Sequence, residues 1–148
     1  MTTIAWDGTT LAVDRGVWNG RMVREQCKLH VIREPKNGWP PGAYASCGDA
    51  AFNTQLVQWM RNGGTRPETA KPEDMDVECG VYVSNGREVF LVMGRGVLLR
   101  LVQQKVGSGG GAHFALGCMV AGTDAVTAVE LAQKHTDCSA FGIDSWRP

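Results

Sequence analysis

The sequence lacks the charge and apolar patterns that would indicate a nucleic acid or a membrane as partner. Its 15 basic and 15 acidic residues balance, and neither sign forms a run, so we expect neither a nucleic-acid surface nor a polybasic membrane patch. No apolar stretch approaches the ~18–20 residues of a transmembrane helix, and the first residues do not resemble a signal peptide. We therefore expect a cytoplasmic protein whose partners are small molecules or other proteins.

Patterns for metal and cofactor binding are also scarce. The five cysteines form no Cys-x-x-Cys pair, and the three histidines show no metal-ligand spacing, so we expect reduced, mostly buried thiols and no metal site. No Walker-type Gly-Lys-Ser/Thr is present. The run 107–112 fits the dinucleotide fingerprint Gly-x-Gly-x-x-Gly/Ala, but that fingerprint needs a parallel βαβ unit, which the flanking segments do not predict. A nucleotide site is the weaker alternative, and we expect no cofactor.

The length of the chain indicates one domain. A chain of 148 residues is long enough to bury about 68–70% of its unfolded surface in a single core. No internal repeat and no low-complexity tract beyond the short glycine run interrupts it. We therefore treat residues 1–148 as a single domain.

The first half of the chain predicts short strands followed by a helix. Asp7-Gly8 is a tight-turn dipeptide between two apolar runs, which is typical of a β-hairpin. The proline- and glycine-rich segment 33–42 cannot continue a strand, and Asn62-Gly63-Gly64 supplies a helix stop. The elements expected here are strands at 2–6, 10–13 and 26–32 and a helix at 49–61.

The second half predicts further strands and then two helices. Asn85-Gly86 between alternating apolar runs is a strong hairpin signal, and the segment 65–75, with Pro67 and Pro72, predicts a connector. The expected elements are strands at 79–83, 88–93, 97–102 and 141–146 and helices at 112–121 and from 123 or 124 to 135. Antiparallel hairpins on either side of a helical segment indicate an α+β layered fold.

The start of the chain, Met1-Thr2-Thr3-Ile4, carries the residues of a catalytic pair. A threonine hydroxyl is a weak nucleophile, but an α-amine with a pKa near ~7.7–8.0 can accept its proton at neutral pH. If Met1 is removed, Thr2 holds both groups. We expect this removal, because threonine is a small second residue.

Several motifs resemble the N-terminal-nucleophile hydrolases of the proteasome β-subunit and HslV kind. The shared features, in chain order, are the start Thr2-Thr3-Ile4, the aspartate of Leu11-Ala12-Val13-Asp14, the lysine of Cys27-Lys28-Leu29, the aspartate of Cys47-Gly48-Asp49-Ala50-Ala51, and the turn Gly107-Ser108-Gly109-Gly110. The likeness spans nearly the whole chain, which resembles a shortened variant of that family. It implies an αββα sandwich of antiparallel sheets with helices on the outer faces.

The resemblance implies that Thr2 is a catalytic nucleophile. Its hydroxyl would attack a carbonyl carbon while its own α-amine accepts the proton. The ammonium of Lys28 would favour the deprotonated forms of both groups, and Asp14 would hold that ammonium in place. The implied substrate is a peptide or protein, and the implied activity is that of a threonine-type peptidase.

Three further site residues follow from the resemblance alone. Ser108 would hydrogen-bond the α-amine, Asp137 would belong to the same site, and the backbone N–H of Ala45 would meet the oxyanion. In this chain Ser139 follows Asp137 by two residues instead of the family's three, and Ala45 stands where relatives usually have glycine. We expect Asp49 to stabilise the start of a helix rather than to catalyse.

A second hypothesis is a catalytically inactive, proteasome-like binding or assembly subunit. It is suggested by the short Asp137–Ser139 spacing, by Met1 in front of Thr2, and by the connector 65–75, where the family has a long helix. The family encloses its sites in oligomers, which implies a homo-oligomer. In relatives the missing helix packs against other subunits or an ATPase. Neither the ring size nor an ATPase partner can therefore be inferred for this chain from the resemblance.

Overall fold

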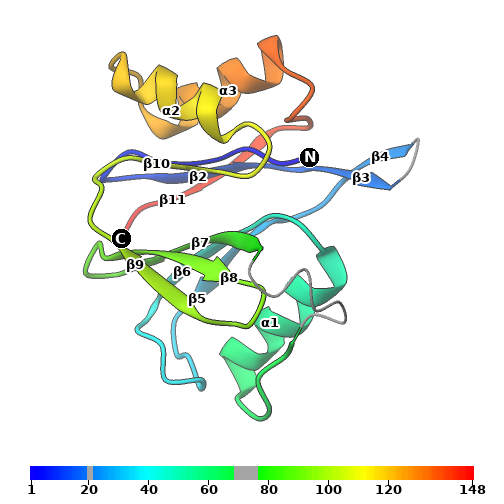
Figure 1. Ribbon diagram of the computed structural model, residues 1–148, viewed down its shortest axis with the longest axis vertical. Helices are drawn as coiled ribbons and strands as arrows, with labels where there is room; N and C mark the ends of the chain where they lie inside the picture. Colours follow the sequence, from blue (N-terminus) through cyan, green and yellow to red (C-terminus); the bar gives the residue numbers. More distant parts are fainter. Residues whose placement is uncertain (20–21, 69–76) are drawn as a thin grey trace.

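The computed structural model describes residues 1–19, 22–68 and 77–148. It is an α+β sandwich of four layers: two helices, a sheet, a second sheet and one helix (Figure 1). This is the expected αββα arrangement of antiparallel sheets with helices on the outer faces. Every strand pair among the described residues is antiparallel, so the glycine run 107–112 lacks the parallel βαβ unit of a dinucleotide site.

The first sheet contains the N-terminal hairpin. Its strands, in the order β10-β1-β2-β11, are β10 (Val106–Ser108), β1 (Ile4–Trp6), β2 (Leu11–Asp14) and β11 (Ile143–Trp146). Helices α2 (Ala112–Val120) and α3 (Ala125–His135) cover its outer face. Ala5 and Ala12 point toward these helices, and their small side chains allow close packing against Met119 and Val129.

The second sheet faces the first across the main core. Its strands, in the order β5-β6-β7-β8-β9, are β5 (Leu29–Ile32), β6 (Gly42–Ser46), β7 (Glu78–Ser84), β8 (Val89–Met93) and β9 (Leu98–Leu101). Helix α1 (Ala50–Asn62) packs on its outer face through Phe52, Leu56 and Met60. Strand β5 is therefore an edge strand that lies beside α1.

Between the sheets lies a core of large apolar side chains. Ile4, Trp6 and Val13 from the first sheet pack against Val81 and Val83 from the second. All five are at most 1% exposed. Each such burial stabilises the fold by about 1.5–3 kcal/mol, so the core holds the ends of β1 and β2 rigidly beside β5.

Two helix starts are capped as their sequences predict. The Asp49 carboxylate accepts a hydrogen bond from Phe52 N at 2.8 Å, and the Asp124 carboxylate accepts one from Thr127 N at 2.7 Å. Both residues satisfy backbone N–H groups that would otherwise lack a partner in the first turn. The structural role expected for Asp49 is confirmed.

The expected elements are confirmed with two kinds of difference. The strand expected at 26–32 begins only at Leu29, and three strand regions were missed. Strands β3 (Gly16–Asn19) and β4 (Met22–Glu25) pair as a separate two-stranded sheet, although Asn19-Gly20 is a hairpin signal in the sequence. The other missed strands are β10 and β6.

Strand β6 (Gly42–Ser46) lies in a stretch for which no strand was expected from the sequence. Its Ala43, Tyr44 and Ala45 are all 0% exposed, because neighbouring strands flank β6 on both sides. Burial in a central strand overrides the weak β-propensity of alanine. Gly42 is also required there, because a Cβ at this position would lie 2.1 Å from Val83 O.

The connector expected at 65–75 is described only in part. Residues 65–68 form neither helix nor strand, and the remainder lies outside the described residues. Among the described residues, no helix is long and apolar enough to cross a membrane.

Candidate active site

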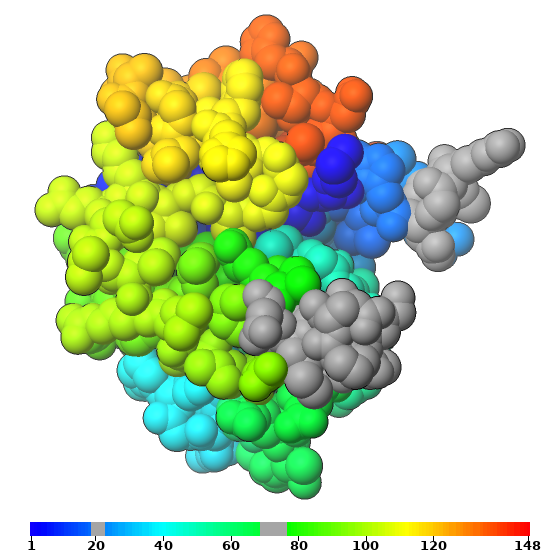
Figure 2. Space-filling view, viewed as in Figure 1, coloured from blue at the N-terminus to red at the C-terminus, as the bar shows by residue number. Residues whose placement is uncertain are grey.

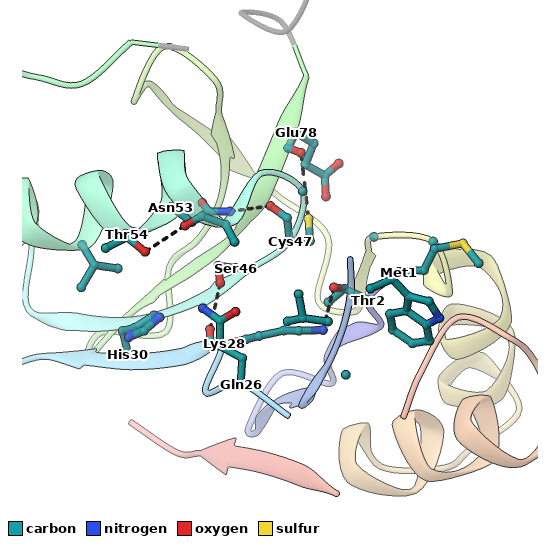
Figure 3. Close-up of a pocket in the computed structure, with 18 of the residues that line it drawn as sticks. Met1, Thr2, Gln26, Lys28, His30, Ser46, Cys47, Asn53, Thr54 and Glu78 are labelled. Atoms are coloured by element: carbon teal, nitrogen blue, oxygen red, sulfur yellow. Dashed lines mark hydrogen bonds between the residues drawn. The ribbon is translucent and has the colours of Figure 1, made fainter. Parts of the chain in front are cut away.

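The ends of three strands bring Thr2, Lys28 and Asp14 together in a buried cluster. Lys28 Nζ donates a hydrogen bond to Thr2 Oγ1 at 2.8 Å and lies 3.3 and 3.2 Å from the two carboxylate oxygens of Asp14 (Figure 3). The three residues are 6%, 4% and 0% exposed. The lysine predicted from the sequence therefore links the predicted nucleophile to the predicted aspartate.

Asp14 is fixed by the backbone around it. Its carboxylate accepts hydrogen bonds from the N–H groups of Thr3 at 2.8 Å, Gly16 at 2.9 Å and Ala140 at 3.3 Å. These donors and the Lys28 ammonium satisfy a charge that would otherwise be strongly unfavourable in a buried position. The carboxylate thus holds Lys28 in one orientation toward Thr2.

The environment lowers the pKa of both amines next to Thr2. Burial lowers the pKa of Lys28, and the neighbouring Asp14 carboxylate opposes this effect. Burial also lowers the pKa of the Met1 α-amine, and the nearby Lys28 charge lowers it further. An amine at this end of the chain is therefore more readily available as a base than a fully solvated one.

The glycine run 107–111 serves close packing around Thr2. A Cβ on Gly109, whose φ is +80°, would lie 2.4 Å from Thr2 O. Gly111 N donates to the same oxygen at 3.2 Å, and a Cβ on Gly111 would lie 1.9 Å from Thr3 Oγ1. Only glycine permits this approach, so the run holds the Thr2 backbone in place.

A cavity of about 640 Å³ opens beside Thr2. Residues from β3, β5, α1 and the glycine turn line it, and Lys28, just before β5, and His30, within β5, extend along its floor (Figure 3). The Met1 side chain also lines the cavity, with its Sδ 4.0 Å from Cys138 Sγ. Met1 is 55% exposed, and Figure 2 shows the N-terminal residues in dark blue at the molecular surface.

Ser108 is close to the cluster but makes a different contact from the one predicted. Its hydroxyl donates a hydrogen bond to the Glu78 carboxylate, and its Oγ lies 3.7 Å from Cys47 Sγ. Glu78 and Cys47 both line the cavity. Burial raises the pKa of the Cys47 thiol to about 11, so this thiol is protonated at neutral pH.

Asp137 is not brought into the site. It is exposed, its side chain makes no hydrogen bond or ion pair within the described part of the chain, and it does not line the cavity. The serine of the same motif behaves differently, because Ser139 is buried and its hydroxyl hydrogen-bonds Thr3 Oγ1. The shortened spacing thus brings Ser139 to the N-terminal strand and leaves Asp137 in solvent.

The oxyanion donor predicted at Ala45 does not fit the geometry. Ala45 lies inside β6, paired with Leu29 and Val81, and is absent from the cavity lining. Gly48 does line the cavity, has a φ of +80°, and its N–H has no hydrogen-bond partner among the described residues. A free backbone N–H beside a cavity can stabilise a developing negative charge.

The cavity residues that were not assigned to the site from the sequence include His30, Arg61, Gly48 and Glu78. His30 could have been found by strand alternation, because it lies two residues after Lys28 and so shares its face of β5. Arg61 continues the helical spacing of α1 residues toward the cavity, and Gly48 lies just before a recognisable helix cap. No local pattern marks Glu78, whose position depends on how the two sheets pack.

No metal centre is indicated in residues 1–19, 22–68 and 77–148. These residues contain no group of three or more histidine, cysteine, aspartate or glutamate side chains arranged to hold an ion. The chemistry available at the cluster is that of a hydroxyl, an ammonium, a carboxylate and backbone N–H groups.

Comparison with known proteins adds evidence on the fold. No protein-family model matches the sequence, and no curated protein matches it. Among solved structures, the chain resembles Thiobacillus denitrificans BPH, with 17% identity and a TM-score of 0.68 over 98% of this chain and 95% of that one. The same protein in complex with epoxomicin gives 16% identity and a TM-score of 0.67, covering 98% and 96% of the two chains.

Anbu proteins share the same architecture. An Anbu Gly-1 mutant from Hyphomicrobium sp. strain MC1 has a TM-score of 0.70 at 12% identity, over 99% of this chain and 80% of that one. A helical assembly of the Anbu complex from Pseudomonas aeruginosa gives 0.68 at 11% identity, with coverage of 100% and 81%. At these identities the likeness establishes the fold of the chain and no more.

Proposed function

We propose that this chain is a proteasome-like threonine peptidase that uses Thr2 after removal of Met1. The observation that carries this proposal is the 2.8 Å hydrogen bond from Lys28 Nζ to Thr2 Oγ1, with Asp14 bonded to the same ammonium. This arrangement lowers the free energy of the Thr2 alkoxide, and the cavity beside it has room for a peptide.

The proposed reaction has two stages. Thr2 Oγ1 attacks the carbonyl carbon of a peptide bond, its proton passes to the free Thr2 α-amine, and the resulting oxyanion accepts a hydrogen bond from Gly48 N–H. The amine then gives the proton to the leaving nitrogen as the carbon–nitrogen bond breaks, which leaves an ester on Thr2. Water, deprotonated by the same amine, hydrolyses that ester and releases the carboxylic acid.

The structural neighbours support the proposal through what has been observed of them. Thiobacillus denitrificans BPH forms a complex with epoxomicin, and an Anbu protein from Yersinia bercovieri is described as an ancestral β-subunit. A peptide epoxyketone has two electrophilic carbons, so it can react with a hydroxyl and an amine on one residue, the pair that Thr2 carries without Met1. We extend this chemistry to Thr2, because Lys28 and Asp14 surround it here.

An inactive subunit is the second candidate. Two observations favour it: Asp137 lies outside the cluster, and Met1 makes the Thr2 nitrogen an amide that cannot accept a proton. In this form the same cavity binds a peptide without cleaving it. The two functions differ in whether the peptide bond between Met1 and Thr2 is present, and an experiment can control this.

The test compares two forms of the protein whose N-termini are verified by intact mass. One form begins at Thr2, released from a cleavable fusion, and the other retains Met1. Against a panel of fluorogenic peptides, we expect hydrolysis only by the form that begins at Thr2 and not by its Thr2→Ala variant. Equal hydrolysis by the Thr2→Ala variant would contradict the peptidase proposal, whereas the absence of hydrolysis in every form would favour the inactive subunit.

We also propose that the chain forms a homo-oligomer. The helical assembly of the Anbu complex is the supporting observation, since that protein shares this fold. Light scattering should give a mass that is a multiple of 16.0 kDa. A single species at the monomer mass over a wide concentration range would contradict this.

A further inference from the structure

The charges that line the cavity are unevenly distributed. Its lining includes three basic side chains, Lys28, His30 and Arg61, and one acidic side chain, Glu78. The Lys28 charge is met by Asp14, and Glu78 is hydrogen-bonded to Ser108. Figure 3 shows Glu78 beside Cys47. The part of the cavity formed by β5 and the end of α1 therefore has two basic groups and no acidic one among the described residues.

The basic part of the cavity follows strand β5 away from Thr2. Lys28 and His30 are two residues apart on one face, a step of about 6.6–6.8 Å along an extended strand. Lys28 contacts Thr2, so His30 lies one step further into the cavity, below α1 (Figure 3). A substrate side chain that starts at the carbonyl attacked by Thr2 and follows β5 passes Lys28 and arrives at His30.

Helix α1 completes this end of the cavity. Ala50, Thr54, Val57 and Arg61 recur at helical spacing and line one wall, with Arg61 in the last turn. Arg61 forms no ion pair within the described part of the chain, whereas Arg15 pairs with Asp144 and Glu25. Its guanidinium is therefore available to a ligand.

The two basic side chains are neighbours. Burial lowers the pKa of His30 and the positive charge of Arg61 lowers it further, while the Asp144 carboxylate, which is paired with Arg15, opposes this effect. At neutral pH His30 is thus a neutral ring with one N–H to donate, and Arg61 supplies the charge. A planar guanidinium beside a ring N–H suits a carboxylate, because each carboxylate oxygen can accept hydrogen bonds from both.

We infer that this cavity selects peptides with a glutamate or aspartate side chain on the acyl side of the cleaved bond, with the carboxylate held between Arg61 and His30. The inference rests on the proposed peptidase function and names its substrate class. A lysine or arginine side chain of the substrate in the same place would be repelled by the positive charge of Arg61. An apolar side chain would displace water from Arg61 without replacing its hydrogen bonds.

The test uses two fluorogenic peptides that differ only by glutamate or glutamine before the cleaved bond. With the protein that begins at Thr2, we expect kcat/KM to be at least about tenfold higher for the glutamate peptide. Arg61→Gln should reduce the ratio toward one through loss of glutamate turnover while glutamine turnover persists. Arg66→Gln is the matched control, because it removes an exposed arginine that lines a different cavity, and it should leave the ratio unchanged.

A binding measurement separates this inference from the peptidase proposal. The same peptides, without the fluorogenic leaving group and labelled at their amino ends, are titrated against the Thr2→Ala variant. Tighter binding of the glutamate peptide, lost in Thr2→Ala/Arg61→Gln, supports the inference even if no peptide is cleaved by any form. Equal affinity for the two peptides, or a preference that survives Arg61→Gln, would overturn it while cleavage at Thr2 still stands on its own evidence.

Discussion

The cluster around Thr2 depends on a buried lysine whose charge is matched by one carboxylate. Asp14 receives three backbone hydrogen bonds in addition to the Lys28 contact, so its position does not depend on the lysine alone. Lys28, in contrast, is held almost entirely by Asp14 and Thr2. Its removal should therefore affect the chemistry more than the fold.

Lys28→Met tests this division of roles. The methionine fills the space of the lysine stem but removes the ammonium, so we expect turnover to fall at least ~100-fold. The free energy of unfolding should fall by no more than about 3 kcal/mol, because the backbone donors still satisfy Asp14. Peptide hydrolysis and urea unfolding measure the two effects. Lys36→Met, at an exposed lysine, is the control, and near-normal turnover in Lys28→Met would remove Lys28 from the mechanism.

The pH dependence of the rate reports on the base. Burial and Lys28 lower the pKa of the α-amine at this end of the chain from 8.0, and we expect the amine of Thr2 to be shifted in the same direction. The amine must be deprotonated to act, so kcat/KM should rise with pH through an apparent pKa below 8 and then level off. A rate that falls over this range, or a midpoint well above 8, would contradict the assignment of the amine as base.

Among single residues, those defined by strand ends were predictable and those defined by packing were not. Thr2, Asp14 and Lys28 were predicted because several motifs together resemble one family, and each lies at or beside the end of a short strand. Asp137 was predicted by resemblance only, and a one-residue change in spacing before Ser139 leaves it exposed. Side-chain position at the ends of loops depends on such single-residue shifts.

At the scale of elements, the loop between β6 and α1 provides the proposed oxyanion donor. Its Gly48 adopts a φ of +80°, and a Cβ there would meet only Glu78 O, at 3.9 Å. Alanine would therefore be strained by its backbone angle rather than by a clash, at about 1–2 kcal/mol.

Gly48→Ala has a matched control in this chain. Gly38 has a φ of +85°, and a Cβ at this position would have no neighbouring atom within 4 Å among the described residues. Both alanine variants should lose about 1–2 kcal/mol of stability, because both place a side chain in the left-handed region. Only Gly48→Ala should lower kcat, by about tenfold or more, because alanine relieves its strained backbone angle by a rotation that moves the Gly48 N–H away from the oxyanion. Equal kcat in the two variants would contradict this prediction.

The cap of α1 gives a second comparison between elements. Asp49→Ala and Asp124→Ala each remove an N-cap carboxylate, so each should lower the free energy of unfolding by about 0.5–2 kcal/mol in denaturant titrations. If Asp49 acts only as a cap, both variants should keep most of their turnover. A selective loss of turnover in Asp49→Ala would give Asp49 a catalytic role.

Elements with strong local signals were predicted well, and those stabilised by tertiary contacts were not. Helices α1 and α3 combine a capping aspartate with apolar residues at helical spacing, and both were expected. Strand β6 is rich in small residues, and its buried place between β5 and β7 is what makes it a strand. Ala45, the oxyanion donor predicted from the sequence, lies within this strand. The proposed donor is therefore Gly48 in the loop that follows.

At the scale of the whole molecule, the two sheets create the site by holding their strand ends side by side. The first sheet supplies Thr2 and Asp14, the second supplies His30, and Lys28 immediately precedes the second sheet's edge strand. The cavity and its charges exist only once the sheets are packed, so no local pattern could reveal the role of Glu78 or the free guanidinium of Arg61.

The central claim is that Thr2 becomes a nucleophile when it is the first residue. Its most direct test is the intact mass and peptide map of the protein beginning at Thr2 after incubation with a peptide epoxyketone. The account predicts one inhibitor per chain, attached to Thr2 and absent from Thr2→Ala and from the form that retains Met1. No adduct in any form, or an adduct on a thiol such as the exposed Cys27 that persists in Thr2→Ala, would contradict it.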